Sequence, residues 1–210
     1  MPRFFSNSDK HKRQRTPPSL HIHPLAWLGA LLLIACDRSM YTALTLAAAL
    51  LHEIGHIAAA AMCGSEIKSI SIYPLGADIR MSQAKSYIAE IIIDGAGIAV
   101  NLLLFIISKA IPQSDIASYF AICNISLATI NALPVKSLDG GEMLSCILML
   151  RTEPDKAEKI SGAVSFCAVF FMWIAAVYIF FYFDGNPSLF LLAVYLFITV
   201  FLKSEGARRK

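Results

Sequence analysis

The sequence HEIGH at positions 52–56 lies inside an apolar stretch that covers about residues 41–62. About 20 apolar residues are needed to cross a bilayer as a helix, so this stretch predicts a membrane-spanning helix. On a helix, His52 and His56 project from one face and can reach one metal ion, while Glu53 approaches a water that the metal activates. The alternative is a helix with incidental histidines and a solvated glutamate. Burying such groups costs roughly 2.5–3.5 kcal/mol per charged side chain, which favours the functional reading.

Composition supports a membrane protein. The chain has 210 residues, of which 57% are hydrophobic and 16% are charged, too apolar for an ordinary soluble domain. Five scattered cysteines with no CxxC pair indicate buried thiols. We expect an all-α polytopic membrane protein with about six transmembrane helices. The apolar runs lie at about 24–36, 41–63, 86–111, 116–150 (interrupted), 160–183 and 188–202.

The distribution of Lys and Arg predicts the orientation in the membrane. With a cytoplasmic N-terminus, the loops on the inside hold all of the 18 basic residues except Arg38, Lys109 and Lys136. We therefore expect basic cytoplasmic tails at residues 1–20 and 204–210, around one membrane domain at residues 21–203. The net charge of +3 follows from this topology and from contact with anionic lipid, and it does not indicate nucleic-acid binding.

A catalytic zinc usually has three protein ligands, so one more is needed from elsewhere in the chain. Asp139 is the best candidate, because Pro134 and the glycines after Asp139 interrupt an otherwise apolar helix. Irregular backbone at membrane depth is tolerated where it is buried in protein or lines a wet cavity. Asp94, inside the 86–111 run, is the rival ligand but lacks an adjacent helix break. Gly95 and Gly97 beside it predict close helix packing rather than chemistry.

Residues 66–81 change from helical to alternating periodicity, with a turn pattern near the middle. We expect a small membrane-associated β-hairpin here, the alternative being an irregular amphipathic loop. Hydrolysis of a helical substrate needs a locally extended segment, and a strand edge containing Ile70 and Ile72 could bind that segment by strand addition.

These motifs together resemble one known family. HEIGH in an early membrane helix, followed about 80 residues later by an N-x-x-P segment and LDGG, resembles the site-2 protease family of intramembrane zinc metalloproteases. The chain is most similar to the stage IV sporulation protease branch. The segments His23–Trp27 and Gly97–Leu104 resemble other helices of the family. Ile98 replaces the family's proline, and Ala132 stands where the family often has Leu or Pro.

The resemblance implies one Zn²⁺ per chain, held by His52, His56 and Asp139, with Glu53 as the general base. Asn131 matches the motif's asparagine, which suits a hydrogen bond to the substrate backbone or an oxyanion, or alternatively a cap at the helix break. The implied substrate is a membrane-associated or single-span protein, such as a precursor sigma factor. The implied partners are membrane proteins that inhibit or regulate the protease. The branch's nucleotide-binding CBS domain is not expected.

Two other functions remain open at this point. One is a catalytically silent membrane scaffold or metal-binding module with the same fold. The other is a membrane zincin that cleaves prenylated or soluble substrates, but such enzymes take a glutamate from a later helix as third ligand. No matching acidic pattern follows Glu158.

Overall fold

The computed structural model describes residues 19–22, 40–65, 67–73, 76–81, 86–111, 114–182 and 194–197. Its elements, in chain order, are β1 (Ser19–Ile22), α2 (Met40–Met62), β2 (Ile67–Tyr73), β3 (Gly76–Met81), α3 (Tyr87–Lys109), α4 (Asp115–Asn131), α5 (Asp139–Met149) and α6 (Pro154–Tyr182). The apolar run predicted at 24–36 lies outside the described residues, as does most of the run at 188–202. The count of six spans therefore stays a prediction.

Three of the described helices, α2, α3 and α6, are long and apolar enough to cross a membrane. Their outward faces carry large apolar side chains, among them Leu50, Ile106 and Phe171 with exposed fractions of 62%, 63% and 68%. An apolar surface of this extent suits lipid rather than water. The chain is an integral membrane protein whose helices present apolar side chains to the bilayer.

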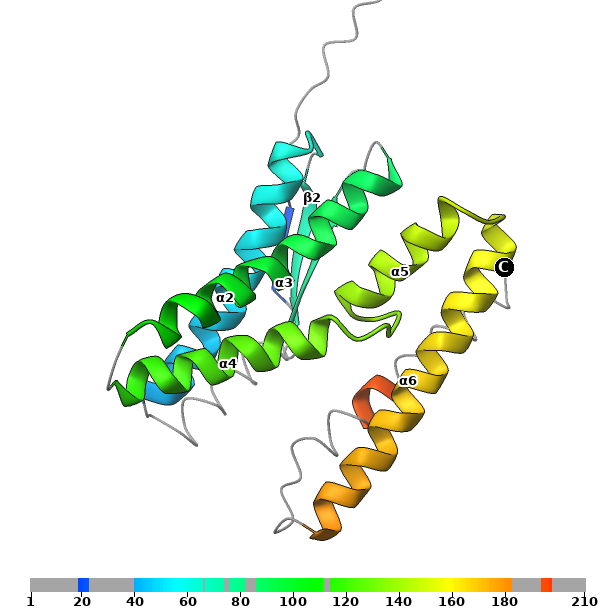
Figure 1. Ribbon diagram of the computed structural model, residues 1–210. Helices are drawn as coiled ribbons and strands as arrows, with labels where there is room; N and C mark the ends of the chain where they lie inside the picture. The colour runs from blue at the N-terminus through cyan, green and yellow to red at the C-terminus, as the bar shows by residue number, and fades with distance from the viewer. Residues whose placement is uncertain are drawn as a thin grey trace, which may run out of the picture.

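Helix α3 is the centre of the described bundle, because it packs against α2, α4 and α5 (Figure 1). Helix α5 in turn contacts α6. The contacts between helices rely on small side chains: Ala60 is fully buried, and a Cβ on Gly55 would stand 2.9 Å from Val100 Cγ2. Small residues let helix backbones approach closely. Helices in a bilayer associate in this way, because lipid tails are as apolar as the side chains and leave van der Waals packing to hold the helices together.

A three-stranded sheet follows α2, in the order β1-β2-β3. Gly64, with φ of 67°, ends α2 in the left-handed conformation that glycine adopts without strain. Strands β2 and β3 pair antiparallel within the range 66–81 for which the sequence predicts a hairpin. Strand β1 pairs parallel with β2 over residues 69–72, and the sequence did not predict it.

This pairing changes the proposed site of strand addition. Contrary to the expectation from the sequence, Ile70 and Ile72 are not on a free strand edge, because both residues lie on the central strand. Ile70 is paired with Leu20 of β1 and Ile79 of β3. Strand β1 has four residues, which is too short for an alternating pattern to be recognised in the sequence. The sequence therefore could not show that β2 has a partner strand on both sides.

The predicted interruption of the fourth apolar run lies between α4 and α5. Helix α4 ends at Asn131, and α5 starts at Asp139 with a fresh set of backbone hydrogen bonds. The connecting segment is held in place from α6: Val135 is fully buried against Val169, and the backbone N–H of Lys136 donates to Ser165 Oγ at 3.0 Å. Asp139 therefore starts a helix instead of lying within one.

Candidate metal centre

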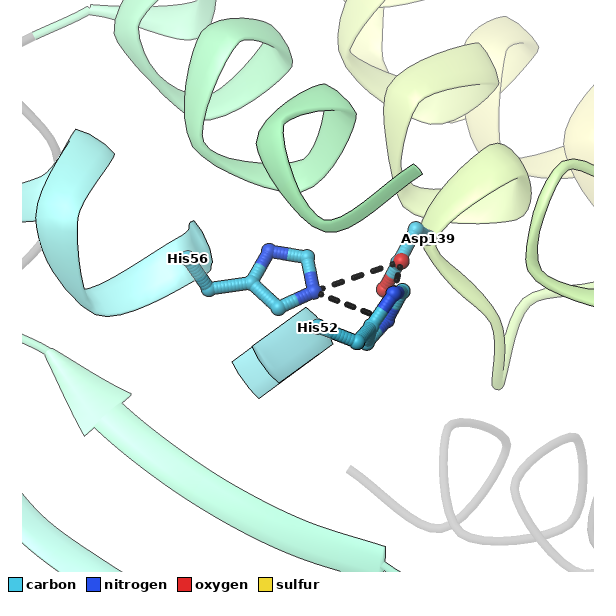
Figure 2. Close-up of side chains that lie close together, drawn as sticks. All are labelled: His52, His56 and Asp139. Atoms are coloured by element: carbon cyan, nitrogen blue, oxygen red, sulfur yellow. Dashed lines mark hydrogen bonds and ion pairs between the residues drawn. The ribbon is translucent and has the colours of Figure 1, made fainter. Parts of the chain in front are cut away.

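The structure brings together three side chains that lie far apart in the sequence. His52 and His56 project from successive turns of α2, and Asp139 reaches them from the start of α5 (Figure 2). Asp139 Oδ2 lies 3.1 Å from His52 Nε2 and 3.3 Å from His56 Nε2, and the two Nε2 atoms are 3.1 Å apart. Both histidines are buried, with exposed fractions of 5% and 8%.

The other nitrogen of each imidazole is already engaged. His56 Nδ1 lies 2.8 Å from the backbone oxygen of Ile93, which can only accept a hydrogen bond. His52 Nδ1 lies 2.5 Å from Asn101 Oδ1, which is likewise an acceptor. Each ring therefore carries its proton on Nδ1 and, when neutral, a lone pair on Nε2.

Three lone pairs thus converge on one point. Asp139 Oδ2 is buried and receives no hydrogen bond, although two ring nitrogens lie within 3.3 Å of it. With both rings neutral and no cation between them, these atoms would repel one another. Zn–N and Zn–O bonds of about 2.0–2.1 Å in tetrahedral geometry place ligand atoms roughly 3.3 Å apart. The observed separations and the two-nitrogen, one-oxygen donor set therefore fit a zinc ion.

Helix α3 shapes this centre through three residues four positions apart: Ile93, Gly97 and Asn101. Ile93 supplies the carbonyl for His56, and Asn101 supplies the amide oxygen for His52. Between them, Gly97 gives room for both rings, because a Cβ there would stand 2.7 Å from His52 Cε1 and from His56 Cε1. Gly97 therefore lies directly beside the candidate ligands His52 and His56, whereas the sequence suggests only a packing role.

The remaining predicted residues lie around this cluster. Glu53 is half-buried on α2 and follows His52 directly in the sequence. Asp94, the rival ligand, is half-buried on α3 and is not part of the group of ligand atoms that the described residues bring together. Asn131 lies at the end of α4, and its Nδ2 donates to Leu127 O at 3.1 Å within the same helix.

Known proteins place this arrangement in a family. The sequence matches Peptidase family M50 over residues 41–113 and 109–174. The chain belongs to peptidase family M50. The matched residues include the HEIGH sequence on α2 and Asp139 at the start of α5. The resemblance to site-2 proteases drawn from the motifs is thereby confirmed.

Individual relatives agree with this assignment. The M50 chain is 24% identical over 192 residues to "Stage IV sporulation protein FB" of Bacillus subtilis, covering 87% of this chain and 65% of the relative. It is 31% identical over 119 residues to "Putative zinc metalloprotease sll0528" of Synechocystis, covering 52% of this chain and 31% of that one. The chain thus spans less than two thirds of each of these curated relatives.

A solved structure has a similar fold. The "Site-2 Protease from Methanocaldococcus jannaschii" superimposes with a TM-score of 0.63 and 22% identity, covering 88% of this chain and 90% of that one. The likeness at this identity concerns the fold alone. The M50 family implies zinc, which agrees with the donor set found here.

Proposed function

We propose that this chain is an intramembrane zinc metalloprotease that hydrolyses a peptide bond of a membrane-associated or single-span protein near the cytoplasmic face. The observation that carries the proposal is the convergence of His52 Nε2, His56 Nε2 and Asp139 Oδ2, with no hydrogen bond to the carboxylate oxygen. Two neutral imidazoles and a buried carboxylate arranged in this way need a cation between them. A chain that only packed its helices would gain nothing from them.

His52, His56 and Asp139 are the proposed ligands of one zinc ion per chain. Zinc bound there would polarise the scissile carbonyl and lower the pKa of a bound water towards about 7. Three protein ligands leave a fourth position open, as catalytic rather than structural zinc sites do.

Glu53 is the proposed general base. It is half-buried on α2 and comes directly after His52, so it lies on the same stretch of helix as the two histidines. Glu53 would take a proton from the attacking water and later pass it to the leaving nitrogen. Asn131 would hydrogen-bond the substrate backbone once its amide leaves Leu127 O.

The two histidines lie in the second half of α2. His56 lies six positions before Met62 at the end of that helix, which corresponds to about 9 Å of helix length. If both termini are cytoplasmic and the domain at 21–203 has six spans, this end of α2 faces the cytoplasm. Water and an unwound substrate segment would then enter from that side.

The sheet is the proposed place where an extended substrate binds. Strand β2 is covered on both sides, so within the described residues the free edges belong to β1 (Ser19–Ile22) and β3 (Gly76–Met81), of which β3 is the longer and the proposed one. In an antiparallel pair, alternate residues direct their backbone groups away from the partner strand. A proline scan over residues 77–80 therefore tests the idea: prolines at outward-facing positions should reduce cleavage while zinc stays bound. Equal cleavage by all four variants would contradict it.

Likeness to the sporulation protein suggests the class of substrate and partner. The substrate would be a membrane-tethered precursor of a regulatory protein, such as a sigma factor. Other membrane proteins would inhibit the protease until the regulatory protein has to be released. The alternative is a silent scaffold or metal-binding module, which the ligand cluster alone would also fit.

Co-expression with a panel of tethered single-span precursors separates these functions. Cleavage that zinc chelation abolishes in detergent would support the protease. Stoichiometric zinc with no cleavage of any precursor, in membranes as well as in detergent, would favour the silent module. Cleavage that persists without zinc would contradict the proposal.

A further inference from the structure

We propose that Asn101 and Asn124 are positioning residues, which form a hydrogen-bond relay that holds His52 in the tautomer with its proton on Nδ1. The inference rests on the proposed metal site, because this tautomer presents a lone pair at Nε2, the atom that faces Asp139. Neither asparagine is a ligand or touches the proposed reacting atoms. They act through His52.

The relay crosses three helices. His52 on α2 contacts Asn101 Oδ1 on α3, and Asn101 Nδ2 donates to Asn124 Oδ1 on α4 at 2.8 Å. Asn124 Nδ2 then donates to the backbone oxygen of Phe120 at 2.8 Å. Asn101 and Asn124 are both fully buried, with exposed fractions of 0%. Two buried amides in an apolar helix bundle are costly unless they are hydrogen-bonded, and these are.

The direction of every hydrogen bond follows from the last one. The Phe120 carbonyl can only accept, so Asn124 must turn its NH₂ group towards it and its oxygen towards Asn101. Asn101 must then donate its NH₂ to that oxygen and present its own oxygen to His52. That oxygen can only accept, so His52 must carry the proton on Nδ1. A reversed relay would set two carbonyl oxygens against each other at Phe120.

The two histidines differ in how they are held. His56 Nδ1 bonds to the backbone oxygen of Ile93, which the α3 helix keeps in place. His52 depends on a side-chain amide, which can present either oxygen or nitrogen after a half rotation. Asn124 removes this ambiguity. Outer-shell partners of metal-binding histidines typically contribute 10–100-fold to metal affinity. Asn101 is such a partner, and its orientation is set by Asn124 of α4.

The test compares four full-length variants in detergent. Asn101→Leu removes the oxygen that accepts from His52 Nδ1. Asn124→Leu keeps Asn101 but leaves its amide free to rotate. Asn101→Asp again presents an oxygen acceptor to His52. Ser108→Ala removes another buried polar group of α3 that lies outside the relay and serves as the control. The readouts are ¹⁵N NMR of labelled histidine in metal-free protein, which reports the tautomer, and zinc affinity by chelator competition.

Asn101→Leu should give mixed His52 tautomers and zinc binding weaker by about 10–100-fold. Asn124→Leu should shift both readouts in the same direction by less, Asn101→Asp should recover the Nδ1–H tautomer, and Ser108→Ala should match the parent protein. An unchanged tautomer in both Leu variants overturns the relay. If Asn101→Leu does not fold, an unchanged tautomer in Asn124→Leu alone overturns it. Both readouts are independent of proteolysis, so a wild-type chain that binds zinc and cleaves nothing would refute the proposed function and leave the relay standing.

Discussion

Gly97 of α3 lies directly against the imidazole of His52, so closely that a Cβ at position 97 would stand 2.7 Å from His52 Cε1. Real Cβ atoms essentially never come this close to another heavy atom, so any side chain at this position must push the ring aside. The absence of a side chain at position 97 thus decides where the two imidazoles can lie.

Gly97→Ala should weaken zinc binding by about tenfold or more, because the added methyl displaces both rings from their positions between α2 and α3. Gly95→Ala is the matched control on the same helix: its Cβ would meet Met143 Cε at 3.5 Å, an ordinary contact with a flexible side chain. Zinc affinity and helical circular dichroism in detergent check both variants. Equal zinc affinities would refute the steric argument.

Replacing the two intramembrane acids should separate the proposed ligand from its rival. Asp139→Asn removes a carboxylate whose Oδ2 lies within 3.3 Å of both Nε2 atoms, so zinc affinity should fall by more than about 100-fold, beyond the range for outer-shell residues. Asp94→Asn should keep one zinc per chain. Elemental mass spectrometry of the purified variants measures this directly, and the reverse order of zinc contents would establish Asp94 as the ligand.

Glu53→Gln should retain zinc and lose proteolysis. The amide has nearly the same shape but cannot take up a proton, and general base catalysis typically contributes 10²–10⁴-fold to the rate. The measurement is the cleavage rate of a tethered precursor at equal zinc content. Cleavage within a few-fold of the parent protein would show that another group is the base.

The glycine pair after Asp139 should be sensitive to added volume. A Cβ on Gly141 would overlap the backbone carbonyl of Val135, which belongs to the segment that positions Asp139. Gly141→Ala should therefore lower the free energy of unfolding by about 1–3 kcal/mol and weaken zinc binding as well. Gly162→Ala on α6 is the control, since its Cβ would stand 3.7 Å from Lys136 Nζ. Thermal unfolding in detergent compares the two, and equal stabilities would count against the prediction.

Which side chains form the candidate metal centre was largely predictable from the chain. His52, Glu53 and His56 follow from helical spacing, and Asp139 from a helix break at membrane depth, since few other arrangements explain such groups in an apolar segment. Asn101 and Gly97 had a weak signal, because they lie in a segment that resembles the family's helix and are four residues apart. Asn124 had none beyond being polar in an apolar run.

The sequence by itself determined the spacing of the histidine pair on α2 and the three long apolar helices α2, α3 and α6, because spacing along a helix and hydrophobic length are local properties. Only the tertiary structure decided which acid meets the histidines, that Gly97 makes room for them, and that β1 covers β2. These are contacts between segments far apart in the chain, and helix crossings and strand order leave no periodic trace in any one segment.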